Sequence, residues 1–219
     1  MKVGTDGVLL GAWTPIPEHA HSILDIGAGS GVIALMLAQR SNAEQVDALE
    51  IDDDAYEQAV ENFEDSPWSD RLFCFHAGLD EFIDEPEDEY DLIVSNPPYH
   101  TEEYFSADEK RNVARFVDSL PFETLVEAAA LLLSETGIFS VIIPYKAEPA
   151  FLALAEAQNL FPIRITRVKG VAHAEIKRSL IAFSRTHAEP EINELVIEIS
   201  RHNYTADYIA LTREFYLNM

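Results

Sequence analysis

The sequence predicts an α/β fold: a mostly parallel sheet of seven strands with helices on both faces and an antiparallel hairpin at one edge. Three observations indicate this fold. Apolar strand-like runs alternate with amphipathic helical stretches, a glycine-rich loop joins the first run to the first helix, and 47% of the 219 residues are hydrophobic. This apolar content suffices for one core, so we expect a single domain over residues 1–219.

The elements follow one another in the order that parallel βαβ units require. Strands are expected at 22–26, 45–50, 71–75, 90–95 and 138–143, with helices at 30–40, 54–65 and 122–134 between them. Beyond residue 149 the pattern indicates a helix at 150–158 and two apolar runs near 161–168 and 180–184, which we expect to pair as the edge hairpin. A further strand-like run at 195–200 and a helix from about 206 to 216 close the chain.

The formal charge of −24 argues against a uniformly basic nucleic-acid surface. Residues 1–100 hold 3 basic and 22 acidic residues, whereas residues 101–219 hold 12 and 17, so a local positive patch can form in the second half. The candidates for phosphate contact are Arg164, Arg167, Lys169, Lys177 and Arg178, with Arg185 nearby. The alternative is that these residues only solvate one edge of the sheet.

Cys74 is the only cysteine, which excludes an internal disulfide, and no apolar run is long enough to span a bilayer. No Cys/His cluster has the spacing of a zinc site, so no metal is expected. These features predict a cytoplasmic protein without membrane contact, in which Cys74 is a small residue of an apolar strand.

The segment Leu24-Asp25-Ile26-Gly27-Ala28-Gly29-Ser30-Gly31 follows a predicted strand and opens a predicted helix. Glycines here let the backbone turn sharply and approach a nucleotide-containing cofactor. Glu50 ends the next strand, where a carboxylate can accept hydrogen bonds from both ribose hydroxyls. Three glycines at alternate positions, the first of them two residues after Asp25, favour a methyltransferase over a nicotinamide-dependent dehydrogenase, although both cofactors fit the loop.

After the fourth predicted strand comes Asn96-Pro97-Pro98-Tyr99, at the edge where open α/β sheets bind ligands. The Asn96 amide oxygen and the Pro97 carbonyl oxygen can each accept an N–H of one planar amino group. Tyr99 can stack on the ring and aim its nitrogen at a methyl donor. We interpret Asn96 as a positioning group and not as a base.

With these residues the chain resembles the class I methyltransferases, which have a Rossmann-like fold, and more closely the bacterial tRNA(Val) adenine-N6 methyltransferases. The resemblance covers nearly the whole chain. Its specific carriers, besides the two loops above, are Met1-Lys2-Val3-Gly4-Thr5-Asp6-Gly7, Leu9-Leu10-Gly11-Ala12-Trp13, Ser66-Pro67-Trp68, Asn203-Tyr204, Ala210-Leu211-Thr212 and Phe215-Tyr216-Leu217.

The resemblance implies S-adenosylmethionine as cofactor and, as substrate, the adenine immediately 3′ of a valine tRNA anticodon, flipped out of its stack. It places Lys2, Thr5 and Asp6 near the methionine end of the cofactor. We expect the chain to be a monomer. Relatives usually carry a short segment before the Met-Lys-Val-Gly motif, so an N-terminal family segment is expected to be missing. They also place an Asp at the end of the third strand to bond the cofactor adenine; here either Asp80 or backbone groups are expected to take its place.

Other functions remain open at this stage. Methylation of a glutamine amide in a protein such as a release factor poses the same chemical problem, and the acidic surface favours it. Methylation of a base in rRNA is a further alternative. A nicotinamide-dependent oxidoreductase or a non-catalytic binding module explains the glycine loop but gives no role to Asn96 or Tyr99.

Overall fold

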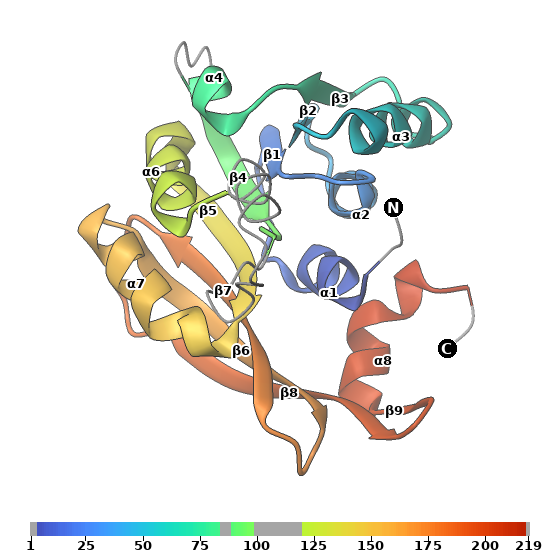
Figure 1. The fold of residues 1–219 in the computed structure, drawn as a ribbon, viewed down its shortest axis with the longest axis vertical. Helices are drawn as coiled ribbons and strands as arrows, with labels where there is room; N and C mark the ends of the chain where they lie inside the picture. Colours follow the sequence, from blue (N-terminus) through green and yellow to red (C-terminus); the bar gives the residue numbers. More distant parts are fainter. Residues whose placement is uncertain (1–3, 84–88, 99–119, 218–219) are drawn as a thin grey trace, which may run out of the picture.

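The computed structural model describes residues 4–83, 89–98 and 120–217. Its centre is one sheet in the order β3-β2-β1-β4-β5-β7-β6-β8-β9 (Figure 1). The strands are β1 Ser22–Ile26, β2 Gln45–Glu50, β3 Leu72–His76, β4 Tyr90–Ser95, β5 Leu133–Pro144, β6 Phe161–Val171, β7 Ile176–Ser184, β8 Glu191–Ser200 and β9 Asn203–Tyr204. Strands β1 to β5 pair in parallel, as do β6 and β8, whereas β7 is antiparallel to both of its neighbours and β9 to β8.

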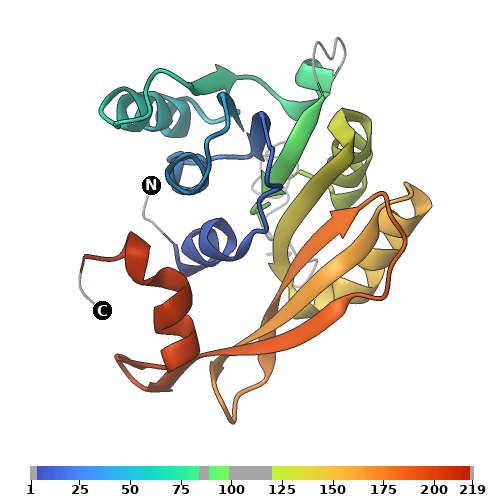
Figure 2. The ribbon, with the colours of Figure 1, turned by 180° about the vertical axis from the view of Figure 1, so that it is seen from behind.

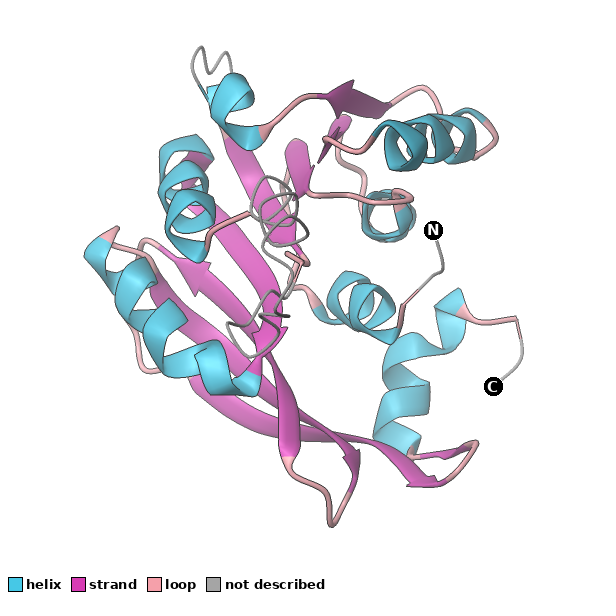
Figure 3. Cartoon of the chain, viewed as in Figure 1, coloured by secondary structure: helices cyan, strands magenta, loops and turns pink. Residues whose placement is uncertain are grey.

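Helices cover both faces of this sheet (Figures 2 and 3). They are α1 Thr5–Trp13, α2 Val32–Arg40, α3 Asp53–Glu64, α4 Leu79–Ile83, α6 Phe122–Leu132, α7 Glu148–Ala157 and α8 Ala206–Thr212, with short 3₁₀ turns η2 Tyr145–Ala147 and η3 Arg213–Phe215. In the part of the chain that the structure describes, no helix is long and apolar enough to cross a membrane.

The two faces of the sheet form two separate hydrophobic clusters. One cluster joins the sheet to α1 and α2 and includes Leu9, Trp13 and Leu37. The other joins the opposite face to α6 and α7 and includes Leu125 and Phe151. Consecutive strand residues such as Ile23 and Leu24 belong to different clusters, as the two-residue period of a strand requires. The prediction of a parallel sheet buried on both faces is therefore confirmed.

Two details of the predicted sheet were wrong. The described residues form nine strands and not seven, and the β6–β7 hairpin is not an edge, because β8 pairs with β6 and β9 pairs with β8. Strand β8 begins at Glu191, four residues before the predicted run at 195–200. Its first four residues, Glu191-Ile192-Asn193-Glu194, are exposed and mostly polar, so they form no apolar run by which a strand is recognised in sequence.

The parallel strands direct their carboxyl ends to one edge of the sheet. Strand β1 lies between β2 and β4, so the chain crosses to opposite sides of β1 after the first and the third strand. Such a topological switch point is where open α/β sheets bind ligands. The glycine-rich loop follows β1, and Asn96 follows β4, so both reach this point.

Candidate cofactor and acceptor site

The glycine-rich loop adopts a conformation that explains its composition. Gly27, Gly29 and Gly31 have φ angles of +73°, +59° and +76°, in the left-handed region that side chains with a Cβ disfavour. The amides of Gly27 and Ala28 both donate to the Leu49 carbonyl oxygen at 2.9 Å, which ties the loop to the end of β2. A Cβ at Gly31 would collide with the Phe63 ring, whereas a Cβ at Gly27 would meet no atom within 4 Å. The exposed Gly27 backbone can therefore be approached closely by a ligand.

Asp25 is fully buried beneath this loop. Its Oδ2 accepts a hydrogen bond of 3.1 Å from the Ala34 amide in the first turn of α2, while Oδ1 has no hydrogen-bond partner among the described residues. Burial raises the pKa of Asp25 to about 7; the Ala34 hydrogen bond opposes the rise and the negative charge of Glu50 adds to it. A carboxyl group that is only partly satisfied thus lies next to the loop.

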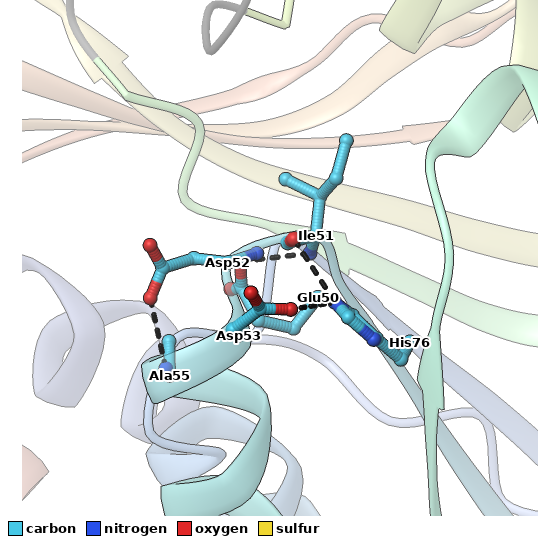
Figure 4. A network of polar contacts seen from close by, with 6 residues as sticks. All are labelled: Glu50, Ile51, Asp52, Asp53, Ala55 and His76. Atoms are coloured by element: carbon cyan, nitrogen blue, oxygen red, sulfur yellow. Dashed lines mark hydrogen bonds and ion pairs between the residues drawn. The ribbon is translucent and has the colours of Figure 1, made fainter.

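Glu50 ends β2, as the sequence predicted, and organises the backbone around it. Oε2 accepts from the Gly29 amide at 2.7 Å. Oε1 accepts from the Ile51 and Asp52 amides at 2.9 Å each (Figure 4). A carboxylate offers about four acceptor positions, so three backbone bonds leave capacity for a further donor. The role of Glu50 toward ribose hydroxyls stays a prediction.

His76 is a residue of this site that sequence reasoning missed. It ends β3 directly opposite Glu50 in the parallel register, and its ring stacks on Tyr56 with centroids 4.8 Å apart. His76 Nε2 lies 3.2 Å from the Ile51 carbonyl oxygen and 3.1 Å from Asp53 Oδ1 (Figure 4). Both partners are acceptors, so Nε2 carries the proton and holds the loop between β2 and α3. No signal in the sequence alone marks His76, because its place opposite Glu50 depends on the β2–β3 register.

Asp80, the expected substitute for the family's adenine-binding acid, lies in the first turn of α4 with an exposed side chain.

Cys74 on β3 has its pKa raised to about 12, chiefly by burial and further by the charges of Glu50 and Asp25. This thiol therefore stays protonated near neutral pH, which agrees with the structural role expected for it.

The loop after β4, which begins Asn96-Pro97-Pro98 and is called the acceptor loop below, is fixed to the strand that precedes the glycine-rich loop. Ser95, the last residue of β4, pairs with Ile26 in the register, and its hydroxyl donates to the Ile26 carbonyl oxygen at 2.9 Å. Asn96 directly follows β4, and Gly27 directly follows β1. Asn96 is half-buried and Pro97 is buried. Tyr99 lies outside the described residues, so its stacking role stays a prediction.

The N-terminal candidates lie on or before α1. Lys2 is outside the described residues, whereas Thr5 begins the helix and Asp6 lies in its first turn. A Cβ at Gly7 would contact Val32 at the start of α2, so this end of α1 is close to the glycine-rich loop. Asp6 Oδ2 accepts from Arg178 Nε at 2.9 Å. Any contact of Asp6 with a cofactor ammonium would share that carboxylate with Arg178.

The basic residues of the predicted patch are distributed over both faces of the sheet, and most have partners within the chain. Arg164 lies over the Trp13 ring of α1, with its guanidinium carbon 4.8 Å from the ring centroid. Arg167 faces α7 and pairs with Glu148, and this hydrogen bond raises its pKa. Of the remaining members, Lys169 pairs with Glu194 at 2.8 Å, Arg178 with Asp6, and Arg185 donates to the Ala130 and Leu133 carbonyl oxygens.

Lys177 differs from these cations. Its side chain is exposed, and among the described residues it forms no ion pair. The hairpin that carries it turns at 172–175, beyond the carboxyl end of β5, because Pro144 pairs with Arg178. The hairpin tip therefore extends past the edge of the sheet that holds the two loops. Contact of the basic residues with phosphate stays a prediction, and Lys177 is the member with a fully available charge.

Comparison with known proteins identifies the family. The family model described as "Methyltransferase small domain" matches residues 8–156. A tRNA1(Val) (adenine(37)-N6)-methyltransferase of Flavobacterium johnsoniae is 70% identical over 100% of this chain and 94% of the relative. Its counterpart in Yersinia enterocolitica is 41% identical over 100% and 87%. Among solved structures, a predicted O-methyltransferase from Agrobacterium tumefaciens shares the fold with a TM-score of 0.73 at 19% identity, covering 95% of this chain and 96% of that one.

Proposed function

We propose that this chain, which belongs to the family of tRNA1(Val) (adenine(37)-N6)-methyltransferases, transfers a methyl group from S-adenosylmethionine to N6 of adenine 37 in a valine tRNA. The observation that carries the proposal is the junction of the two loops. Ser95 fixes the start of Asn96-Pro97 to the strand end from which the glycine-rich loop departs. A donor on one loop and an amine on the other would therefore meet at the β1/β4 switch point.

The residues present fit the cofactor. Gly27 is exposed and has open space where a side chain would be, which allows close approach of an adenosyl group. Asp25 offers an unpaired carboxyl oxygen, and Glu50 keeps acceptor capacity at the end of β2. When bound, S-adenosylmethionine supplies an electrophilic methyl group on a sulfonium. The chain would hold it through Gly27, Gly29, Gly31 and Glu50, with Lys2, Thr5 and Asp6 at its amino-acid end.

The acceptor side would work by positioning. The amino nitrogen of adenine is a weak nucleophile because its lone pair is delocalised into the ring. The amide oxygen of Asn96 and the carbonyl oxygen of Pro97 would accept its two N–H groups, and Tyr99 would stack on the base. The methylated nitrogen is cationic and loses a proton readily to water, so no strong base is required. A cytoplasmic monomer acting on free tRNA completes the proposal.

The test is methyl transfer from radiolabelled S-adenosylmethionine to unmodified valine tRNA, followed by nucleoside analysis. We expect N6-methyladenosine at position 37 and none in a transcript in which that adenine is replaced by guanine. The same assay with rRNA and with a release factor as acceptors decides the alternatives. Label in either of these, with none in tRNA, would refute the proposed substrate. Stabilisation by S-adenosylhomocysteine and not by nicotinamide dinucleotides tests the cofactor independently of the acceptor.

A further inference from the structure

A buried ion pair lies beside the acceptor loop and has no role in the mechanism above. Glu148, at the start of α7, is 4% exposed. It accepts from Arg167 Nη2 at 2.7 Å and from Arg167 Nε at 3.2 and 3.3 Å, and the Ser179 hydroxyl donates to its Oε2. This contact engages one whole edge of the guanidinium group. Arg167 is thereby held in a single orientation, although a third of its side chain is exposed.

The oriented guanidinium group lies against an aromatic ring. The Arg167 guanidinium carbon is 5.6 Å from the centroid of the half-buried Tyr145 ring. Three separate elements therefore fix Tyr145 and Arg167 relative to each other: Tyr145 is in η2, Glu148 in α7, and Arg167 with Ser179 in the β6–β7 hairpin. An aromatic ring and a guanidinium plane are the two kinds of protein surface on which unpaired nucleobases stack.

The strand register places Tyr145, and with it Arg167, on the side of the sheet edge next to the acceptor loop. Ser95, the last residue of β4, is opposite Val141 of β5, and β5 continues for three more residues to Pro144. Tyr145 directly follows Pro144. Tyr145 and Arg167 are therefore at the carboxyl edge of the sheet, on the side of Asn96 away from the glycine-rich loop. The glycine-rich loop occupies the other side of Asn96, so the Tyr145 side is the one left for a nucleotide adjacent to a base bound at Asn96.

The charges distinguish stacking from phosphate binding. Glu148 neutralises Arg167 at direct contact, so the Glu148–Arg167 ion pair carries no net charge and attracts a phosphate weakly. Lys177 retains its charge and is the better phosphate contact. A neutral and fixed group of planar side chains is instead suited to a base, because stacking needs no net charge and loses little conformational entropy on a surface already fixed.

We propose that Tyr145 and Arg167 form a stacking surface for a nucleobase that flanks the target adenine. The proposal rests on the proposed function, since it takes RNA as the substrate. It assigns to Arg167 recognition of an unpaired base and not the phosphate contact expected from the sequence. Glu148 and Ser179 act as positioning residues that hold the guanidinium plane.

The experiment measures the dissociation constant of a valine tRNA anticodon stem-loop at several salt concentrations. The variants are Tyr145→Leu, Tyr145→Phe and, as the matched charge control, Lys177→Ala. We expect Tyr145→Leu to weaken binding by about tenfold with an unchanged salt slope, and Tyr145→Phe to bind like the wild type. Lys177→Ala should reduce the slope of log Kd against log salt by about one, as expected for the loss of one phosphate contact. S-adenosylhomocysteine binding is measured for each variant and should stay unchanged.

Three results would overturn the proposal: wild-type affinity in Tyr145→Leu, a reduced salt slope in that variant, or equal weakening by Tyr145→Leu and Tyr145→Phe. Loss of S-adenosylhomocysteine binding in Tyr145→Leu would also count against it, because the ring would then support the fold. Methyl transfer by the wild type reports on the proposed function separately. An enzyme that methylates position 37 while Tyr145→Leu binds RNA normally refutes only the stacking surface.

Discussion

Replacing Asp25 by Asn is expected to change how the free energy of unfolding depends on pH. Asn is isosteric and can still accept from the Ala34 amide, so the fold should be retained. The pKa of Asp25 is raised from its ordinary value of 3.8 to about 7. For a carboxyl group whose pKa is higher in the folded state, the stabilising contribution is complete below pH 3.8, falls as the pH rises toward 7, and is lost above it. The full loss is roughly 4 kcal/mol.

Urea unfolding of the wild type and of Asp25→Asn, followed by tryptophan fluorescence at pH 5 and pH 8, measures this effect. From the two pKa values, the stability of the variant relative to the wild type should increase by about 3 kcal/mol between these pH values. Asp80→Asn removes one negative charge from an exposed position and reports the effect of net charge alone. A relative stability of Asp25→Asn that is the same at both pH values would refute the reasoning.

Three further changes test the site and its supports. Asn96→Ala should lower methyl transfer by about a hundredfold or more while S-adenosylhomocysteine affinity stays within about twofold, because Asn96 holds the acceptor; parallel loss of both in calorimetry would contradict this. Gly31→Ala should cost at least about 2 kcal/mol of unfolding free energy, since its φ is +76° and a Cβ would collide with Phe63, whereas Gly170→Ala, with open space, should cost less. Asp52→Ala should cost about 1 kcal/mol in the same unfolding assay, and Asp52→Asn little, because the side chain caps α3; equal losses would exclude the cap.

The site elements that are contiguous in sequence were predictable, and those that depend on distant partners were not. The strand, glycine-rich loop and helix around Asp25, and the strand end at Glu50, follow from local periodicity and glycine spacing. Helix α1 was not predicted as a helix, because it is buried over most of its surface and its apolar residues show no helical period. The role of His76 required knowledge of the β2–β3 register.

The basic patch shows the same limitation for charge. Arg178 pairs with Asp6, 172 positions earlier in the chain, and Arg167 with Glu148 on another element. Counting charges along the segment from Arg164 to Arg185 includes these cations but not the carboxylates of Asp6 and Glu148, so the count overstates the positive charge available to RNA. The partners depend on how α1 and α7 pack on opposite faces of the sheet, which local sequence does not specify.

The bond between the Ser95 hydroxyl and the Ile26 carbonyl oxygen has a consequence for how the reaction centre is assembled. If donor and acceptor bind at these two loops, they would lie just beyond the ends of two adjacent paired strands, and the spacing of β1 and β4 would help to set the distance between methyl carbon and nitrogen. Catalytic geometry would then arise in the same cooperative step as the sheet itself. Variants that loosen β1 against β4 should lose turnover at the temperature at which they lose strand structure.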